Sequence, residues 1–241
     1  MSITFNETSS DDFGMLMQNE LVFKTIERDM ETVKVPGRDG VILLDNDRDE
    51  PLDFPLVFLM KKTIHFDTIE EQIHAVRGWL SGKTGYHYLT WIGEPKHSYR
   101  ARINGATTVR RRNSRLAYVD APFEFHPRKF LTTGLVEKTI TNNSILTGQG
   151  SLNALPIIRI TGTGNVTLTI NGKNLVLQNV TGGVIVDCEL ETVTNLTGTA
   201  SMMQHLYSYP FPFLVPGDNY ISWTNPSQFS VAMIPRWGDK A

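Results

Sequence analysis

A short aromatic stretch near the end of the chain, YPFPFLVPGDNYISW (residues 209–223), contains residue types that bind sugars. Aromatic rings stack on the apolar faces of sugar rings, and the candidate stacking residues are Tyr209, Phe211 and Trp223. The stretch is also typical of a β-sandwich core, in which Asn219 bonds local backbone beside a Pro-Gly turn. Four residues alternate around this turn as core-facing positions would: Phe213, Val215, Ile221 and Trp223. We favour the core interpretation and retain sugar binding as the alternative.

Two acidic stretches have residue types that could bind metal or transfer protons. DNDRDE (residues 45–50) lacks the sixth-position glycine and the distal glutamate of an EF-hand, so we interpret it as a solvated loop. Along one predicted strand, acids alternate at Asp187, Glu189 and Glu191. A glycoside hydrolase would need two carboxylates that face one cleft. A solvated strand face explains the alternation adequately. The six histidines lack ligand spacing. We expect no catalytic residues, metal or cofactor, and a protein that is not an enzyme.

One basic cluster stands out: Arg110, Arg111, Arg112 and Arg115, in TTVRRRNSR. It can be a solvated turn between two strands, or a charged contact with another chain or with phosphate. A three-residue run in a chain of net charge −2 is weak evidence for nucleic-acid binding. We therefore expect no specific nucleic-acid binding.

The composition of the 241 residues, 40% hydrophobic and 20% charged, indicates a globular protein with a core of its own. Cys188 is the only cysteine, which excludes an intrachain disulfide and a cysteine-based zinc site. The opening residues, MSITFNETSSDDF, lack the basic and apolar regions of a signal peptide, and no apolar run reaches membrane-spanning length. We expect a protein that is made in a cytoplasm and has no membrane contact.

Periodicity predicts one helix among many strands. The helix has Thr68 and Glu71 in capping-box spacing and Gly82 at its end, with one apolar stripe formed by Ile69, Ile73, Val76 and Leu80. Elsewhere, short β-branched runs alternate with Gly and Asn turns, which indicates a mainly β fold. ITGTGNVT contains G-x-G, but a strand follows it, so we predict a hairpin turn rather than a phosphate loop.

A stretch rich in Thr, Asn and Gly, residues 136–153, marks the predicted domain boundary. We expect an N-terminal domain over residues 1–135, and a C-terminal β-sandwich or jelly roll over residues 136–241. The second domain, from about Gly150 onward, is expected to fold alone.

The order of the motifs resembles the distal tail proteins of long-tailed siphophages over essentially the whole chain. VKVPGRDGVILLD (33–45) is similar to an early turn of that family, and RGWLSGK (77–83) to the end of its helix. LNALPIIRITGTGNVTLTING (152–172) resembles the start of its second domain. GVIVDCELETV (183–193) and FLVPGDNYISW (213–223) resemble two later elements. Each motif is common in β proteins, but their order and spacing are fairly specific.

This resemblance implies a structural virion protein: an N-terminal β-sandwich-like domain with one helix, which closes into a homohexameric ring, and a galectin-like sandwich outside it. The ring would join the tail tube protein to tail-tip, tail-associated fibre or lysin, receptor-binding or baseplate proteins at the distal end of the tail, and DNA would pass through its lumen. No segment is long enough for the extra carbohydrate-binding module that some members carry. The alternative function is a carbohydrate-binding module that recognises the host wall.

The candidate assembly contacts are the turn Pro36, Gly37, Arg38, Asp39 and Gly40, together with the four arginines. The turn is expected to be tight, with Gly37 or Gly40 at positive φ. The arginines are expected to point away from the lumen and to meet acidic groups at subunit or partner contacts, the candidates being Asp45, Asp47, Asp49 and Glu50.

Overall fold

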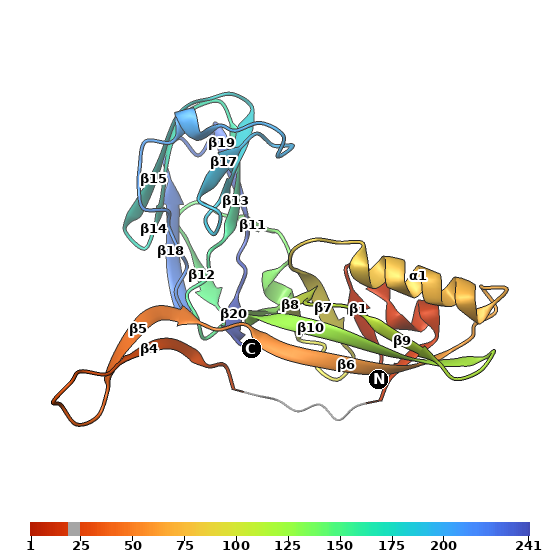
Figure 1. The fold of residues 1–241 in the computed structure, drawn as a ribbon. Coiled ribbons are helices and arrows are strands. Elements are labelled where there is room, and N and C mark those ends of the chain that lie inside the picture. Colours follow the sequence, from red (N-terminus) through yellow and green to blue (C-terminus); the bar gives the residue numbers. More distant parts are fainter. Residues whose placement is uncertain (19–24) are drawn as a thin grey trace. The chain divides into compact units, whose positions relative to one another are not determined.

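The computed structural model describes residues 1–18 and 25–241 and contains two compact units, whose elements are drawn in Figure 1. Unit 1 comprises Met1–Lys129 together with Lys240–Ala241, and unit 2 comprises Phe130–Asp239. The last two residues join unit 1, where the Ala241 backbone N–H donates to the Pro127 carbonyl at 3.1 Å. The fold is mainly β, as the sequence predicts.

Unit 1 is built on a nine-stranded sheet with the order β2-β1-β7-β8-β10-β6-β3, while β9 and β20 also pair with β10. The strands of this sheet are β1 (Ile3–Phe5), β2 (Thr8–Ser9), β3 (Met15–Met17), β6 (Leu52–Lys61), β7 (His87–Trp91), β8 (His97–Ile103), β9 (Thr108–Arg111), β10 (Leu116–Leu131) and β20 (Gly238–Lys240), of which Lys240 belongs to unit 1. Two more strands, β4 (Arg28–Val33) and β5 (Ile42–Asp49), form a separate two-stranded sheet. A 3₁₀ turn, η1 (Ser10–Phe13), precedes β3.

Helix α1 (Ile69–Ser81) covers the core of unit 1 with the predicted stripe, of which Ile69, Val76 and Leu80 are fully buried. The Thr68 hydroxyl caps the helix by accepting from the Glu71 N–H at 3.2 Å. Gln72, also fully buried, was not predicted: its amide donates to two backbone carbonyls, and its oxygen accepts from the Thr63 N–H at 3.0 Å. A buried amide with all these partners fixes the helix on the sheet.

Unit 2 is a sandwich of two antiparallel sheets around one apolar core. The five-stranded sheet has the order β11 (Lys138–Ile140), β19 (Phe229–Ile234), β13 (Ile157–Gly162), β16 (Gly183–Asp187) and β17 (Thr192–Thr194). The four-stranded sheet has the order β12 (Ser144–Gly148), β18 (Gly217–Trp223), β14 (Gly164–Ile170) and β15 (Lys173–Val180). Two short 3₁₀ turns are η2 (Thr132–Gly134) and η3 (Met203–His205).

The G-x-G segment is a corner between sheets, so the predicted hairpin turn is wrong. β13 pairs within the five-stranded sheet and β14 within the four-stranded one, with Thr163 alone between them. Gly162 has φ of 152°, and a Cβ there would lie 2.4 Å from the Gln228 carbonyl oxygen. The glycines therefore let the chain change sheets in one step, a role that local sequence does not distinguish from a hairpin.

The Pro-Gly turn before β18 is held by Asn219, which is fully buried. Its side-chain oxygen accepts from the Val215 N–H at 2.8 Å, and its amide donates to the carbonyls of Leu146, Val215 and Gly217 at 2.9–3.1 Å. The predicted local backbone bonding is confirmed. The alternation predicted before the turn is wrong in part, because Leu214 is buried whereas Phe213 and Val215 are half-buried.

We predict that a fragment of residues 130–239 unfolds cooperatively, because it contains both complete sheets and their core. A fragment starting at Gly150 lacks β11 and β12, which pair with β19 and β18. It should unfold at lower denaturant than the longer fragment, as followed by circular dichroism. Absence of a cooperative transition in the longer fragment would contradict the prediction.

Candidate functional site

The β4–β5 hairpin is the part of unit 1 that lacks a core of its own. Its two strands pair with each other, and no residue of either is fully buried. An isolated two-stranded hairpin is marginally stable in water at best. Among the described residues, no further strand pairs with its two outer edges, and such edges are a template for pairing with another chain. The hairpin therefore has the physical character of an element that a neighbouring chain completes.

Exposed apolar side chains lie on both faces of this hairpin. Met30, opposite Asp45, is 51% exposed, and Leu43, opposite Thr32, is 59% exposed. Leu44, opposite Glu31, lies on the other face and is 47% exposed. Val35 and Val41 continue the apolar surface into the loop. Isolated exposed apolar residues are ordinary, but a cluster of this kind marks a contact surface. We call these five residues the hairpin surface.

The loop that closes the hairpin contains the predicted tight turn. The Arg38 N–H donates to the Val35 carbonyl at 3.2 Å across Pro36 and Gly37. Gly37 and Gly40 have φ of 80° and 81°, so the prediction of positive φ is confirmed for both. Pro before a positive-φ glycine is the signature of a type II turn, which explains this local sequence. A role of this turn in assembly stays a proposal.

Arg28, which sequence reasoning missed, organises the acidic stretch that follows the loop. Its guanidinium donates to the Asp45 carboxylate at 2.9 Å and to Asp47 at 2.5 Å, and lies 3.6 Å from Asp49. Asp47 has positive φ, and its N–H donates to the Asp45 side chain at 2.8 Å. The strand pairing shifts at this point, so the stretch is a bulge rather than a free loop. Within the described residues, no cluster of His, Cys, Asp and Glu forms a metal site.

The Arg28 hydrogen bond, with that of the Asp47 N–H, holds the pKa of Asp45 below its ordinary value. Because this pKa is lowered in the fold, the interaction is fully present above the unfolded value of about 3.9 and is lost as pH falls through the folded pKa. We predict a carboxyl NMR titration of Asp45 with a midpoint below 3.9. Arg28→Gln should raise this midpoint, whereas Arg38→Gln, on the turn, should not. An unchanged midpoint in Arg28→Gln would contradict the assignment.

The basic cluster lies at the β9–β10 turn, and all four arginines are exposed. Arg110 pairs with Asp120 at 2.9 Å and Arg111 with Glu70 at 2.6 Å, while Arg112 donates to the Tyr118 hydroxyl at 3.4 Å. Their expected acidic partners pair elsewhere within this chain: Asp45, Asp47 and Asp49 with Arg28, Asp49 also with Lys240, and Glu50 with Arg48. Contacts of the cluster between subunits stay a proposal.

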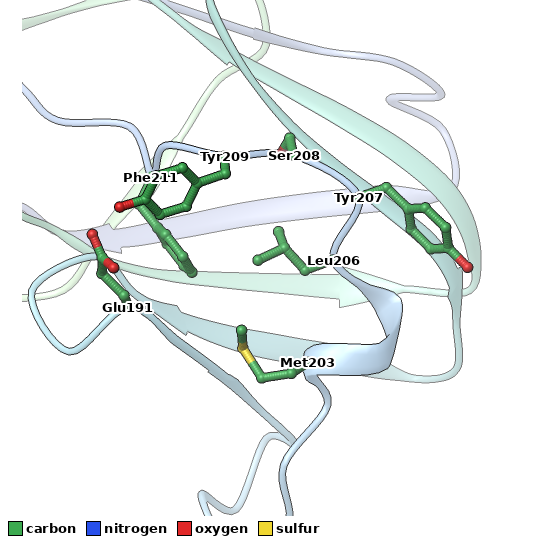
Figure 2. Close-up of a pocket in the computed structure, with 7 residues that line it drawn as sticks. All are labelled: Glu191, Met203, Leu206, Tyr207, Ser208, Tyr209 and Phe211. Atoms are coloured by element: carbon green, nitrogen blue, oxygen red, sulfur yellow. The ribbon is translucent and has the colours of Figure 1, made fainter.

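The three candidate sugar-stacking residues are not brought together. Trp223 is 8% exposed within the core, and its indole N–H donates to the Phe229 carbonyl at 3.2 Å. Trp223 is therefore a core residue, as the favoured interpretation predicts. The alternative, in which it stacks on a sugar, is wrong for this residue. Tyr209 is 74% exposed and contacts Phe211, which is 6% exposed, at an open pocket (Figure 2).

The alternating acids near β16 have separate roles. Arg236, 11% exposed, holds the Asp187 carboxylate with two hydrogen bonds of 2.8 and 3.0 Å and lies 3.1 Å from Glu189. Asp187 also accepts from the N–H groups of Glu189 and Leu190, which fixes the turn after β16. Glu191 follows this turn and lines the pocket with Tyr209. The three acids thus do not share one solvated face, and that prediction is wrong.

Within the described residues, no helix is long and apolar enough to cross a membrane. Residues 1–116 match the family model described as a phage tail protein N-terminal domain. The chain is also similar to the crystal structure of the Dit protein of phage SPP1, described as a paradigm of the hub of the adsorption apparatus in phages infecting Gram-positive bacteria. That match has 17% identity and a TM-score of 0.70 and covers 100% of this chain and 98% of that one.

A chain of the phage P2 baseplate in its activated conformation matches at 10% identity with a TM-score of 0.49, covering 95% of this chain and 91% of that one. Comparison with curated proteins gives no significant match. The first part of the chain thus resembles a phage tail protein N-terminal domain, and the whole chain has the fold of the SPP1 Dit protein. The family model and the fold shared with the Dit protein agree with the siphophage distal tail protein family that the motifs resemble.

Proposed function

We propose that this structural tail protein is the distal tail hub of a long-tailed phage, and that six copies close into a ring through the β4–β5 hairpin. The observation that carries the ring is the hairpin without a core: it has exposed apolar residues on both faces, and within the described part of the chain no third strand pairs with it. A hairpin that adds to the next subunit in a head-to-tail manner generates a closed ring when the rotation between copies closes.

In this proposal, one face of the ring docks the tail tube protein. The other docks tail-tip, fibre or lysin, receptor-binding or baseplate proteins. The hub assembles in the host cytoplasm and occupies the distal end of the tail in the virion. The proposed role of the hub is structural, since a ring with two different faces joins two different partners. In this proposal, unit 2 lies outside the ring.

Electron-microscopic averaging of the purified full chain tests this proposal. The expected image is a sixfold ring with an open centre. Single particles without symmetry, or rings of another order, would contradict it.

The lumen of such a ring is proposed to let DNA pass without holding it. Six copies at a formal charge of −2 each carry −12, and the arginine cluster already has carboxylate partners in Asp120 and Glu70. Each arginine that paired with phosphate would add about 0.9 to the salt slope of DNA binding. We therefore place Arg110, Arg111, Arg112 and Arg115 away from the channel, at subunit or partner contacts.

We predict weak binding of duplex DNA to the purified ring, unchanged when Arg110, Arg111 and Arg112 are replaced by glutamine. Fluorescence anisotropy across a salt series measures the affinity of the ring for DNA. Tight, salt-sensitive binding that disappears in this variant would place the cluster on the lumen wall.

A further inference from the structure

An open pocket with a volume of about 400 Å³ lies in unit 2, beside the segment that pairs with the outer edge of β15. This volume falls within the range of about 300–1,000 Å³ typical of small-molecule sites. Leu206 and Met203 supply apolar lining, and Figure 2 shows Leu206 at the centre, with Met203 beside it. Tyr207 points away from Tyr209 and Phe211.

The segment that forms one wall is fixed to the sandwich. Leu206 forms a bridge with Leu177 of β15, and the Tyr207 N–H donates to the Val176 carbonyl at 2.9 Å. The Ser208 hydroxyl accepts from the Val176 N–H at 2.8 Å. The backbone that presents Tyr209 is therefore hydrogen-bonded to a strand, and little ordering is needed when a ligand binds.

The aromatic part of the pocket has one braced ring that faces solvent. Tyr209 packs edge-to-face on Phe211, with ring centroids 6.5 Å apart and planes at 84°. Phe211 is buried, whereas Tyr209 is 74% exposed, so one ring supports the other and leaves most of its surface available. A tyrosine supplies rigid, amphipathic contact area at low entropy cost, which suits a weakly apolar ligand with many hydroxyls.

The polar part of the pocket is the Glu191 carboxylate, at the same end as the two rings in Figure 2. It is the one charged side chain among the lining residues. The turn before it is fixed by Asp187 and Arg236. A carboxylate accepts hydrogen bonds from hydroxyl groups and repels anions, so a neutral ligand that carries several hydroxyls is compatible with it.

We propose that this pocket binds a neutral pyranose, with the apolar face of the sugar on Tyr209 and its hydroxyls donating to Glu191. Phe211 acts as a positioning residue, since it holds the Tyr209 ring in place. Trp223 has no part in the site. This proposal does not rest on ring assembly, because every residue in it belongs to unit 2.

Saturation-transfer NMR of the full chain with glucose, galactose, N-acetylglucosamine and N-acetylgalactosamine tests the proposal, with calorimetry for the affinity. At least one sugar should bind. Tyr209→Ala should lower the affinity for that sugar about tenfold or more, and Glu191→Ala should lower it as well. Tyr220→Ala is the matched control, since Tyr220 is a 64% exposed tyrosine of unit 2 that does not line the pocket. It should bind as the unmodified protein does.

The thermal midpoint of Tyr209→Ala should stay unchanged, because its side chain is mostly in water. Absence of binding for all four sugars would overturn the proposal. Equal losses of sugar affinity in Tyr209→Ala and Tyr220→Ala would overturn the proposal as well, and so would an unchanged affinity in Tyr209→Ala.

Discussion

Replacement of Leu43 and Leu44 by aspartate is expected to convert the proposed ring into monomers. The two leucines lie on opposite faces of the hairpin and are 59% and 47% exposed in the single chain. Full burial of a leucine contributes about 1.5–3 kcal/mol, so partial burial of two leucines supplies a substantial part of one subunit contact. An aspartate in the same place must be desolvated without a partner, which adds a further cost. The same change is repeated at every contact of the ring.

Size-exclusion chromatography with light scattering measures this outcome. The variant should elute at the chain mass of 27.1 kDa with an unchanged circular dichroism spectrum, because neither side chain belongs to a core. Leu190→Asp is the control, since Leu190 is an even more exposed leucine of unit 2, which the proposal places outside the ring. A double variant that keeps the assembled mass would show that the hairpin surface is not the subunit contact.

Replacement of Asn219 by alanine is expected to lower the free energy of unfolding of unit 2 by about 3 kcal/mol or more. The change leaves the Val215 N–H and the Leu146 carbonyl without their side-chain partner. Each buried polar group left unsatisfied costs about 1–3 kcal/mol. The turn before β18 also loses the two bonds that close it locally.

Denaturant titration of the 130–239 fragment gives this difference. Asn174→Ala provides the comparison, because Asn174 is exposed and its side-chain oxygen accepts from the Thr169 hydroxyl at 2.8 Å. Surface substitutions of this kind usually change stability by less than about 0.5 kcal/mol. Equal effects of the two substitutions would show that Asn219 does not hold the turn.

Residues whose role is local could be predicted from the sequence. The stripe of α1, the Thr68 cap, the positive φ of Gly37 and Gly40 and the backbone bonding of Asn219 all depend on neighbours within a few positions. The order of such elements was also enough to indicate the family. Periodicity and turn chemistry act at this range, so a single sequence contains their signal.

Roles that depend on distant partners could not be predicted. Gln72 is buried because Phe13 and Lys61 present carbonyls to it, and Arg28 meets three aspartates across a bulge. Phe211 and Trp223 stand twelve positions apart in one aromatic stretch, yet only the first reaches the pocket. Which partner a side chain meets follows from strand order and from the crossing between sheets, and G-x-G at the β13–β14 corner gave no signal of that crossing.

The mass of the native protein tests the hub most directly, since the two docking faces and the open lumen of the proposed function depend on a ring of six. Native mass spectrometry of the purified full chain is expected to give a particle of six times 27.1 kDa that persists on dilution to low micromolar concentration. A stable particle at 27.1 kDa under the same conditions would contradict a self-assembling hexameric hub.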